Sequence, residues 1–158
     1  MSTPTTTLIR TPEHGDVTWF FNALVTTKAA MSETAGAYSL TEHLVTAASN
    51  PPMHVQTDED EAFYILEGEI EFEVDGQVTV AAPGTFAFVA RGAAHTFRVL
   101  TPTARMLVIC SGKPVDNLED FFLGMGEPAT HRGLPTPGAP DESKLVELCL
   151  RTGIELVG

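Results

Sequence analysis

The sequence predicts an all-β domain, a barrel or sandwich of short antiparallel strands, followed by one or two helices. The first reason is length, since 158 residues suit a single hydrophobic core. The second is a series of short β-rich runs between residues 17 and 115, separated by Gly, Pro, Asn or Asp at a regular spacing. The third is strict alternation at residues 69–74, where Ile70, Phe72 and Val74 share one face and three glutamates share the other.

Three parts follow one another along the chain. Residues 1–16 are rich in turn formers and show no periodicity, so we expect a flexible N-terminal arm there. Residues 17–115 should form the barrel, with strands at 18–28, 37–46, 62–66, 69–74, 77–81, 85–89, 96–100 and 105–110. Asp75-Gly76 tolerates the positive φ of a two-residue hairpin loop and joins two of these runs. Residues 116–158 should form a helical extension that packs on the barrel.

The helical extension contains its own start and stop signals. Asn117 or Asp116 can cap a short amphipathic helix that continues to about residue 124. A connector rich in Gly and Pro at 133–140 leads to a second helix at 141–151, which Gly153 can end.

The charge of the chain excludes several classes of partner. Nine Lys and Arg residues against 21 Asp and Glu residues give a formal net charge of −12, so phosphate backbones and anionic membrane surfaces are repelled. No apolar run approaches the roughly 18 to 20 residues of a spanning helix, and the first residues lack a secretory signal. We therefore expect a cytoplasmic protein that binds neither nucleic acid nor membrane. Cys110 and Cys149 should be buried apolar residues rather than a disulfide or a nucleophile.

Side chains suited to metal chemistry occur near the middle of the chain. His54 and Gln56 are two residues apart, which places them on one face of a strand, and Glu61 follows five residues after Gln56. His95 begins another β-rich run, 34 positions after Glu61. Two imidazoles and a carboxylate that converge inside a barrel would make the 2-His-1-carboxylate arrangement, which holds ferrous iron and leaves positions open for substrate and oxygen.

Other polar residues have a simpler interpretation. The three consecutive carboxylates at residues 58–60 are expected to form a solvated loop rather than a metal site. His14, His43 and His131 are expected to be surface or packing histidines, with His43 in the pattern of an outer strand.

The pattern resembles the cupin family. The family's first motif runs Gly, five residues, His-x-His, three or four residues, Glu, six residues, Gly. The sequence matches this motif at His54, Glu61 and Gly68. It departs from the motif at Ala48, where the family has Gly, and at Gln56, where the family has the second His. The second motif runs Gly, five residues, Pro-x-Gly, two residues, His, three residues, Asn; the sequence matches it at Gly84, Gly92 and His95 and departs from it at Ala90 and Val99. The resemblance covers about residues 37–110. The segments before and after it resemble the extensions of single-domain cupins that are grouped with quercetin dioxygenases and polyketide-tailoring enzymes.

The resemblance implies a fold, a cofactor and an assembly. The fold is a jelly-roll barrel, the double-stranded β-helix. The cofactor is one divalent transition metal (Fe²⁺, Ni²⁺, Mn²⁺ or Zn²⁺) held by His54, Glu61 and His95, with Gln56 at a fourth position where the family has histidine. Gln56 offers a neutral carbonyl oxygen, which is a weaker donor than imidazole towards transition metals. Relatives are often dimers, so the expected assembly is a homodimer.

The expected function is that of a metal-dependent dioxygenase for a small aromatic, flavonol-like or polyketide-like substrate. Glu61 is the expected catalytic residue, which takes the hydroxyl proton of the substrate. Substrate-binding residues are expected among the apolar side chains on barrel strands, whichever of them point inward: Phe63, Phe86, Phe88, Phe97 and Met106. Two alternatives stay open: an isomerase or cyclase that uses the metal without oxygen, and a small-molecule-binding protein without turnover.

Overall fold

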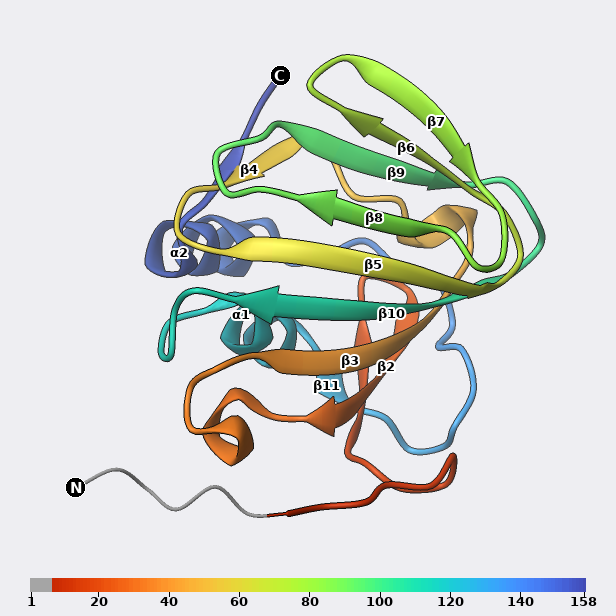
Figure 1. Ribbon diagram of the computed structural model, residues 1–158, viewed down its shortest axis with the longest axis vertical. Coiled ribbons are helices and arrows are strands. Elements are labelled where there is room, and N and C mark those ends of the chain that lie inside the picture. Colours follow the sequence, from red (N-terminus) through yellow and green to blue (C-terminus); the bar gives the residue numbers. More distant parts are fainter. Residues whose placement is uncertain (1–6) are drawn as a thin grey trace.

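Two antiparallel β-sheets face each other across the core in the computed structural model, which describes residues 7–158 (Figure 1). The seven-stranded sheet runs in the order β11 (Glu127–Pro128), β1 (Val17–Phe20), β2 (Ala23–Ala29), β3 (Ser39–Val45), β10 (Ala104–Ser111), β5 (Asp60–Glu67) and β8 (Phe86–Val89). The five-stranded sheet runs in the order β12 (Ile154–Leu156), β4 (His54–Gln56), β9 (His95–Val99), β6 (Ile70–Val74) and β7 (Gln77–Ala81). The all-β prediction is confirmed, with the two sheets hydrogen-bonded separately rather than closed into one barrel.

The alternation of the sequence places the core between the sheets. Along β10, burial alternates at every residue, and Met106 and Val108 are each only 1% exposed. In the facing sheet, Ile70 and Phe72 on β6 are buried, while Glu71 between them and Glu73 after Phe72 are partly exposed. Each sheet therefore turns one apolar face towards the other, as expected for a sandwich.

The expected long strand at residues 18–28 is two strands. A turn at Phe21-Asn22 separates β1 from β2, and both residues have positive φ, 43° and 61°. Asparagine adopts this conformation readily, whereas an aromatic residue rarely does, so the run showed no clear break. The short strand β12 was also not expected; it pairs with β4 and brings the C-terminal segment against the strand of His54.

Part of the N-terminal arm is held on the sandwich. Residues 1–6 of the expected arm lie outside the described residues. Arg10 forms an ion pair with Glu33 at 2.6 Å, on the short 3₁₀ helix η1 (Met31–Thr34). Lys28 Nζ donates to the backbone carbonyls of Thr11 and His14 at 3.0 Å. These contacts hold residues 10–14 against β2 and η1.

The helical extension consists of α1 (Leu118–Met125) and α2 (Glu142–Thr152). The side chain of Asn117 accepts from the backbone N–H of Asp120, which caps α1 as the sequence predicts. Gly153 ends α2 with φ 76°. Figure 1 shows both helices at one end of the sheets. Neither helix within residues 7–158 is long and apolar enough to cross a membrane.

Candidate metal centre

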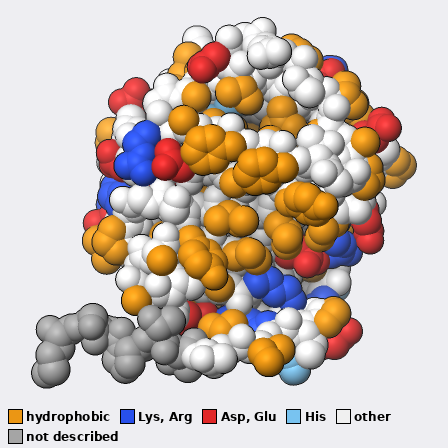
Figure 2. All heavy atoms as spheres, in the orientation of Figure 1, with side chains coloured by type: hydrophobic (Ala, Val, Ile, Leu, Met, Phe, Trp, Pro, Cys, Tyr) orange, Lys and Arg blue, Asp and Glu red, His pale blue; other side chains and the backbone are white. Residues whose placement is uncertain are grey.

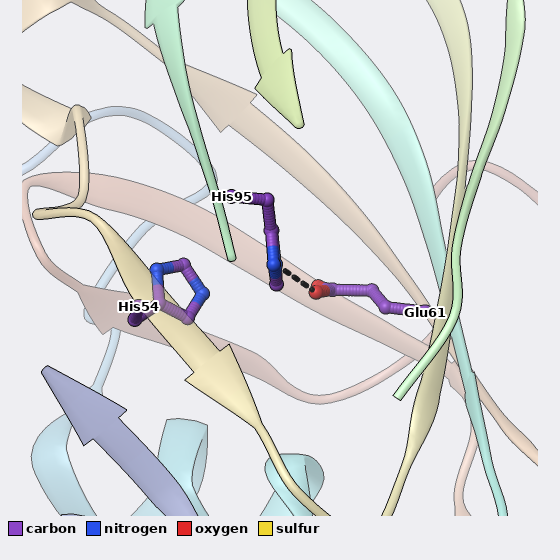
Figure 3. A group of neighbouring side chains, drawn as sticks. All are labelled: His54, Glu61 and His95. Atoms are coloured by element: carbon purple, nitrogen blue, oxygen red, sulfur yellow. Dashed lines mark hydrogen bonds and ion pairs between the residues drawn. The ribbon is translucent and has the colours of Figure 1, made fainter. Parts of the chain in front are cut away.

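Three strands bring His54, Glu61 and His95 to one point between the sheets. Each residue offers a ligand atom, and these atoms all lie within 4.8 Å of one another. Figure 3 shows His54 from β4, His95 from β9 and Glu61 from β5 pointing towards one another. His95 Nε2 lies 3.1 Å from Glu61 Oε2. Glu61 and His95 are 5% and 2% exposed, and His54 is partly exposed.

Sheet pairing explains this convergence of residues distant in sequence. His54 and His95 are direct partners across the antiparallel pair of β4 and β9, and their ring centroids are 4.3 Å apart. Glu61 belongs to the opposite sheet, where it pairs with Val89 and Cys110. The carboxylate thus reaches the two imidazoles across the interior of the sandwich.

Backbone carbonyls fix both imidazole rings. His54 Nδ1 lies 2.8 Å from the carbonyl oxygen of Pro52, and His95 Nδ1 lies 3.0 Å from that of Ala93. A carbonyl oxygen only accepts, so Nδ1 carries the proton in each ring and Nε2 of the neutral ring keeps its lone pair. Metal-binding histidines are held in this way, because the second hydrogen bond sets the tautomer and the orientation of the ring.

Gln56 completes the group from the same face of β4. It is 4% exposed, and its Nε2 donates to Glu61 Oε2 at 2.8 Å. Its carbonyl oxygen, Oε1, is fully buried and has no hydrogen-bond partner among residues 7–158. A buried acceptor without a partner is costly unless a ligand or cation completes it. Two imidazole nitrogens and one carboxylate fit a divalent transition metal in the 2-His-1-carboxylate arrangement.

The two histidines differ in their protonation. Burial lowers the pKa of His54, and the nearby His95 lowers it further, so its Nε2 is unprotonated at neutral pH. Burial also lowers the pKa of His95, but the hydrogen bond and charge of Glu61 outweigh this effect and leave the pKa raised. Because a metal needs the lone pair of Nε2, metal binding must displace any proton that His95 shares with Glu61.

The triad lies on the wall of a mostly apolar cavity of about 80 Å³. Phe63, Phe97 and Met106, three of the expected substrate-binding residues, line it. Sequence reasoning missed a second set of aromatic residues, which come from the β1–β2 turn and from α1: Phe20, Phe21, Phe121 and Phe122. Their aromatic character was visible, but no local pattern shows which turn or helix folds over the end of a sandwich.

Two expected substrate-binding residues lie elsewhere. Phe86 and Phe88 on β8 are 62% and 58% exposed and point to the outer face of the seven-stranded sheet, so the expectation that they line the pocket is corrected. The inward positions of this strand are Ala87 and Val89. The run Phe-Ala-Phe-Val is apolar on both faces, so periodicity could not show which face is inside.

The acidic loop also differs from the expectation in one residue. Asp58 is exposed, and Asp60 forms an ion pair with Arg91 at 3.0 Å. Glu59 is instead 2% exposed, and one carboxylate oxygen accepts from the backbone N–H of Leu118 at 2.7 Å. Burial raises the pKa of Glu59 to about 7. This carboxyl group therefore joins the loop between β4 and β5 to the first turn of α1.

The remaining expectations concern His43 and the cysteines. His43 is 5% exposed, packs against Phe122 and lines the cavity, so it is a packing histidine and not a surface one. Cys110 and Cys149 are free and buried, as expected.

A match to a protein family falls on the same strands. Residues 41–111, which include all three residues of the triad, match the family described as the cupin domain. Over these residues, a little under half of its length, the chain is similar to cupin domains. Its first and second motifs supply the two histidines and the carboxylate described above.

Known cupins resemble the chain over parts of its length. The quercetin 2,3-dioxygenase of Bacillus subtilis (strain 168) is 28% identical over 91 residues, 58% of this chain and 26% of that enzyme. The chain therefore spans about a quarter of the length of this curated relative. A predicted oxalate decarboxylase from Thermotoga maritima has a TM-score of 0.60 at 16% identity, covering 67% of this chain and 99% of the other. The polyketide cyclase RemF from Streptomyces resistomycificus has a TM-score of 0.55 at 23% identity, covering 66% and 79%. These structural likenesses show the cupin fold.

Proposed function

We propose that this cupin is a metal-dependent dioxygenase of small aromatic, flavonol-like or polyketide-like compounds. The observation that carries the proposal is the triad of His54, Glu61 and His95 on the wall of an aromatic cavity. The polar groups of the triad can bind the reacting oxygen of a substrate, while the phenylalanine side chains contact its rings. The sequence similarity to a quercetin 2,3-dioxygenase supports this substrate class.

Each residue of the site has a proposed role. His54 and His95 would hold a divalent metal through Nε2, because backbone carbonyls occupy both Nδ1 atoms, and Glu61 would hold it through a carboxylate oxygen. When bound, this metal would lower the pKa of an enol or phenol oxygen that contacts it and leave positions open for oxygen. Oε2 of Glu61 accepts from Gln56 and lies beside His95, so we assign the hydroxyl proton of the substrate to the other oxygen of Glu61. Gln56 is the proposed fourth ligand through Oε1.

An isomerase or cyclase that needs no oxygen is the second candidate. The observation in its favour is the amide oxygen of Gln56 at the fourth position, because oxygen donors suit metals that act as Lewis acids without changing oxidation state. In such an enzyme the same residues would polarise a carbonyl group and move a proton.

One experiment separates these candidates from a cupin that only binds a ligand. The metal content of freshly purified protein is measured, and oxygen uptake and product formation are followed with a panel of flavonols and aromatic polyketides, in air and under argon. If the protein is a dioxygenase, we expect about one bound metal ion per chain and product formation only in air. Product at full rate under argon would identify the isomerase or cyclase. A protein without stoichiometric metal would contradict both enzymes.

We also propose that two copies of the chain pair through an outer apolar patch. We use this name for seven residues on the outer face of β3, β10, β5 and β8: Leu40, Ala62, Tyr64, Phe86, Phe88, Leu107 and Ile109. Figure 2 shows hydrophobic side chains gathered on this face. Phe86, Tyr64 and Leu107 are cross-strand partners in one row, so the patch is continuous.

The charges beside the outer apolar patch favour a second copy as its partner. Glu42 forms an ion pair with Arg105 at 2.7 Å, and Asp60 forms one with Arg91 at 3.0 Å. A chain with a net charge of −12 repels another copy over most acidic surfaces. The outer apolar patch is a face where carboxylates are already paired, and a two-fold axis places its aromatic residues against themselves.

Replacing Phe88 with glutamate should convert the dimer into a monomer. The substitution puts an unpaired charge within the interface, and the same charge on its two-fold mate. Molar mass is measured by light scattering during gel filtration for the wild type, for Phe88→Glu and for Leu150→Glu. The last variant is the control, since Leu150 is an exposed apolar residue (82%) on α2, outside the patch. A monomeric wild type, or a dimeric Phe88→Glu, would refute the pairing.

A further inference from the structure

We propose that His43 determines substrate specificity by hydrogen-bonding a hydroxyl group on the part of the substrate that is remote from the triad. The inference rests on the proposed function only in taking the cavity as the place where the substrate binds. His43 lies outside both cupin motifs, and the inference gives it a direct contact with the ligand.

The sheet register places His43 at a different level of the cavity from Glu61. Ser39 on β3 and Glu61 on β5 are both cross-strand partners of Cys110 on β10, so they share one level of the sheet. His43 lies four residues further along β3, beside Met106. At about 3.3 Å per residue, the backbone of His43 is therefore about 13 Å along the strand direction from the level of Glu61.

One nitrogen of the His43 ring is occupied and the other is not. Nε2 lies 2.8 Å from Oγ1 of Thr41, and the edge of the ring packs against Phe122 with centroids 5.1 Å apart. Nδ1 has no hydrogen-bond partner among residues 7–158. The fully buried side-chain oxygens and nitrogens that lack a partner there are Gln56 Oε1 and Glu59 Oε1. Nδ1 of His43 also lacks a partner but is not fully buried, so part of its surface is accessible. The accessible space beside His43 is the cavity.

Few other polar groups in the cavity could take this role. Apart from the triad and Gln56, the lining residues with a side-chain oxygen or nitrogen are His43 and Ser49. The hydroxyl of Ser49 accepts from the backbone N–H of Thr46 at 3.1 Å and so caps the 3₁₀ helix η2 (Ala47–Ser49). His43 thus supplies the available nitrogen in a wall that is otherwise aromatic or aliphatic.

The protonation of His43 selects the kind of group that it can bind. Burial lowers its pKa to about 4, although the charge of Glu61 opposes the shift, so the ring is neutral at pH 7. A neutral imidazole gives no charge compensation to a carboxylate or phosphate. Its nitrogens are one donor and one acceptor, and a hydroxyl group can pair with either. We therefore assign a neutral hydroxyl rather than an anionic group.

Two probes that differ by one remote hydroxyl test the assignment. Affinities of 2-naphthol and 2,6-dihydroxynaphthalene are measured for the zinc-loaded and metal-free protein, and for His43→Phe and His43→Gln. The extra hydrogen bond should make the wild type bind the diol about fivefold more tightly. Phenylalanine should abolish this preference and glutamine should retain part of it. In protein labelled with ¹⁵N-histidine, the Nδ1 signal of His43 should shift with the diol and not with 2-naphthol, while His14 serves as an internal control.

The outcomes separate this inference from the proposed function. Equal affinity of the wild type for the two probes, or a preference that survives in His43→Phe, would overturn the role of His43. So would an Nδ1 signal that does not respond to the diol, a result that needs no variant to fold. A wild type that binds no metal would defeat the proposed function, yet the metal-free measurements would still decide whether His43 contacts the hydroxyl.

Discussion

Replacing His95 with alanine should weaken the binding of a divalent transition metal by at least about a hundredfold. Loss of a partner behind a ligand typically costs 10- to 100-fold in metal affinity, and loss of a ligand should cost at least as much. His95 is 2% exposed and its ring is fixed by the carbonyl of Ala93, so no other side chain can easily take its place. The dissociation constant for zinc is measured by competition with a chromophoric chelator.

The control for this measurement is another histidine of the same chain. His14→Ala removes an imidazole that is exposed and bonded to Thr11, outside the cavity. Its zinc affinity should equal that of the wild type. Loss of a metal ligand should weaken zinc binding by at least about a hundredfold. A zinc affinity of His95→Ala within about threefold of the wild type would therefore contradict the proposed centre.

The variant Glu61→Gln is compared with the wild type in zinc affinity and in turnover. The substituted side chain keeps an oxygen that can accept from Gln56 Nε2 but loses the negative charge beside His95. The zinc affinity should fall, and turnover of any substrate found in the panel should cease. Turnover at the wild-type rate with metal bound would remove Glu61 from the proton-transfer step.

The grouping of His54, Glu61 and His95 could be predicted from the sequence mainly through its resemblance to the two cupin motifs, because local spacing sets only part of it. The distance of two residues between His54 and Gln56 fixes their common face on a strand, and strand pairing then sets His95 opposite His54. Glu61 follows after the short loop 57–59 but belongs to the other sheet, so spacing alone does not place it beside the histidines.

The cavity wall could not be predicted to the same extent, because it depends on long-range packing. Phe86 and Phe88 look like core residues, but the pairing register of β8 sets them beside Tyr64 and Ala62 on the outer face of the sheet. Phe121 is on an amphipathic helix whose apolar face was expected, although the sequence does not show that this face closes the cavity. His43 follows Glu42 in an alternating strand, and alternation alone does not tell which of two polar neighbours points inward.

Gly68→Ala should lower the free energy of unfolding by about 3 kcal/mol or more. Gly68 has φ +77°, a conformation that costs alanine about 1 to 2 kcal/mol. A Cβ there would also lie 2.6 Å from the backbone oxygen of Thr103 and 2.9 Å from Cα of Ala104. These are backbone atoms at the entry to β10, the central neighbour of β5, so they cannot move aside without disturbing the sheet.

Gly76→Ala separates the two causes of this loss. Gly76 has φ +81°, almost the same as Gly68, but a Cβ there would meet nothing within 4 Å. Its cost should therefore be the conformational part alone, about 1 to 2 kcal/mol. Both variants and the wild type are unfolded in urea under identical conditions. Equal losses would mean that backbone conformation alone requires glycine at position 68; a larger loss for Gly68→Ala would show that the close approach of β5 and β10 requires it.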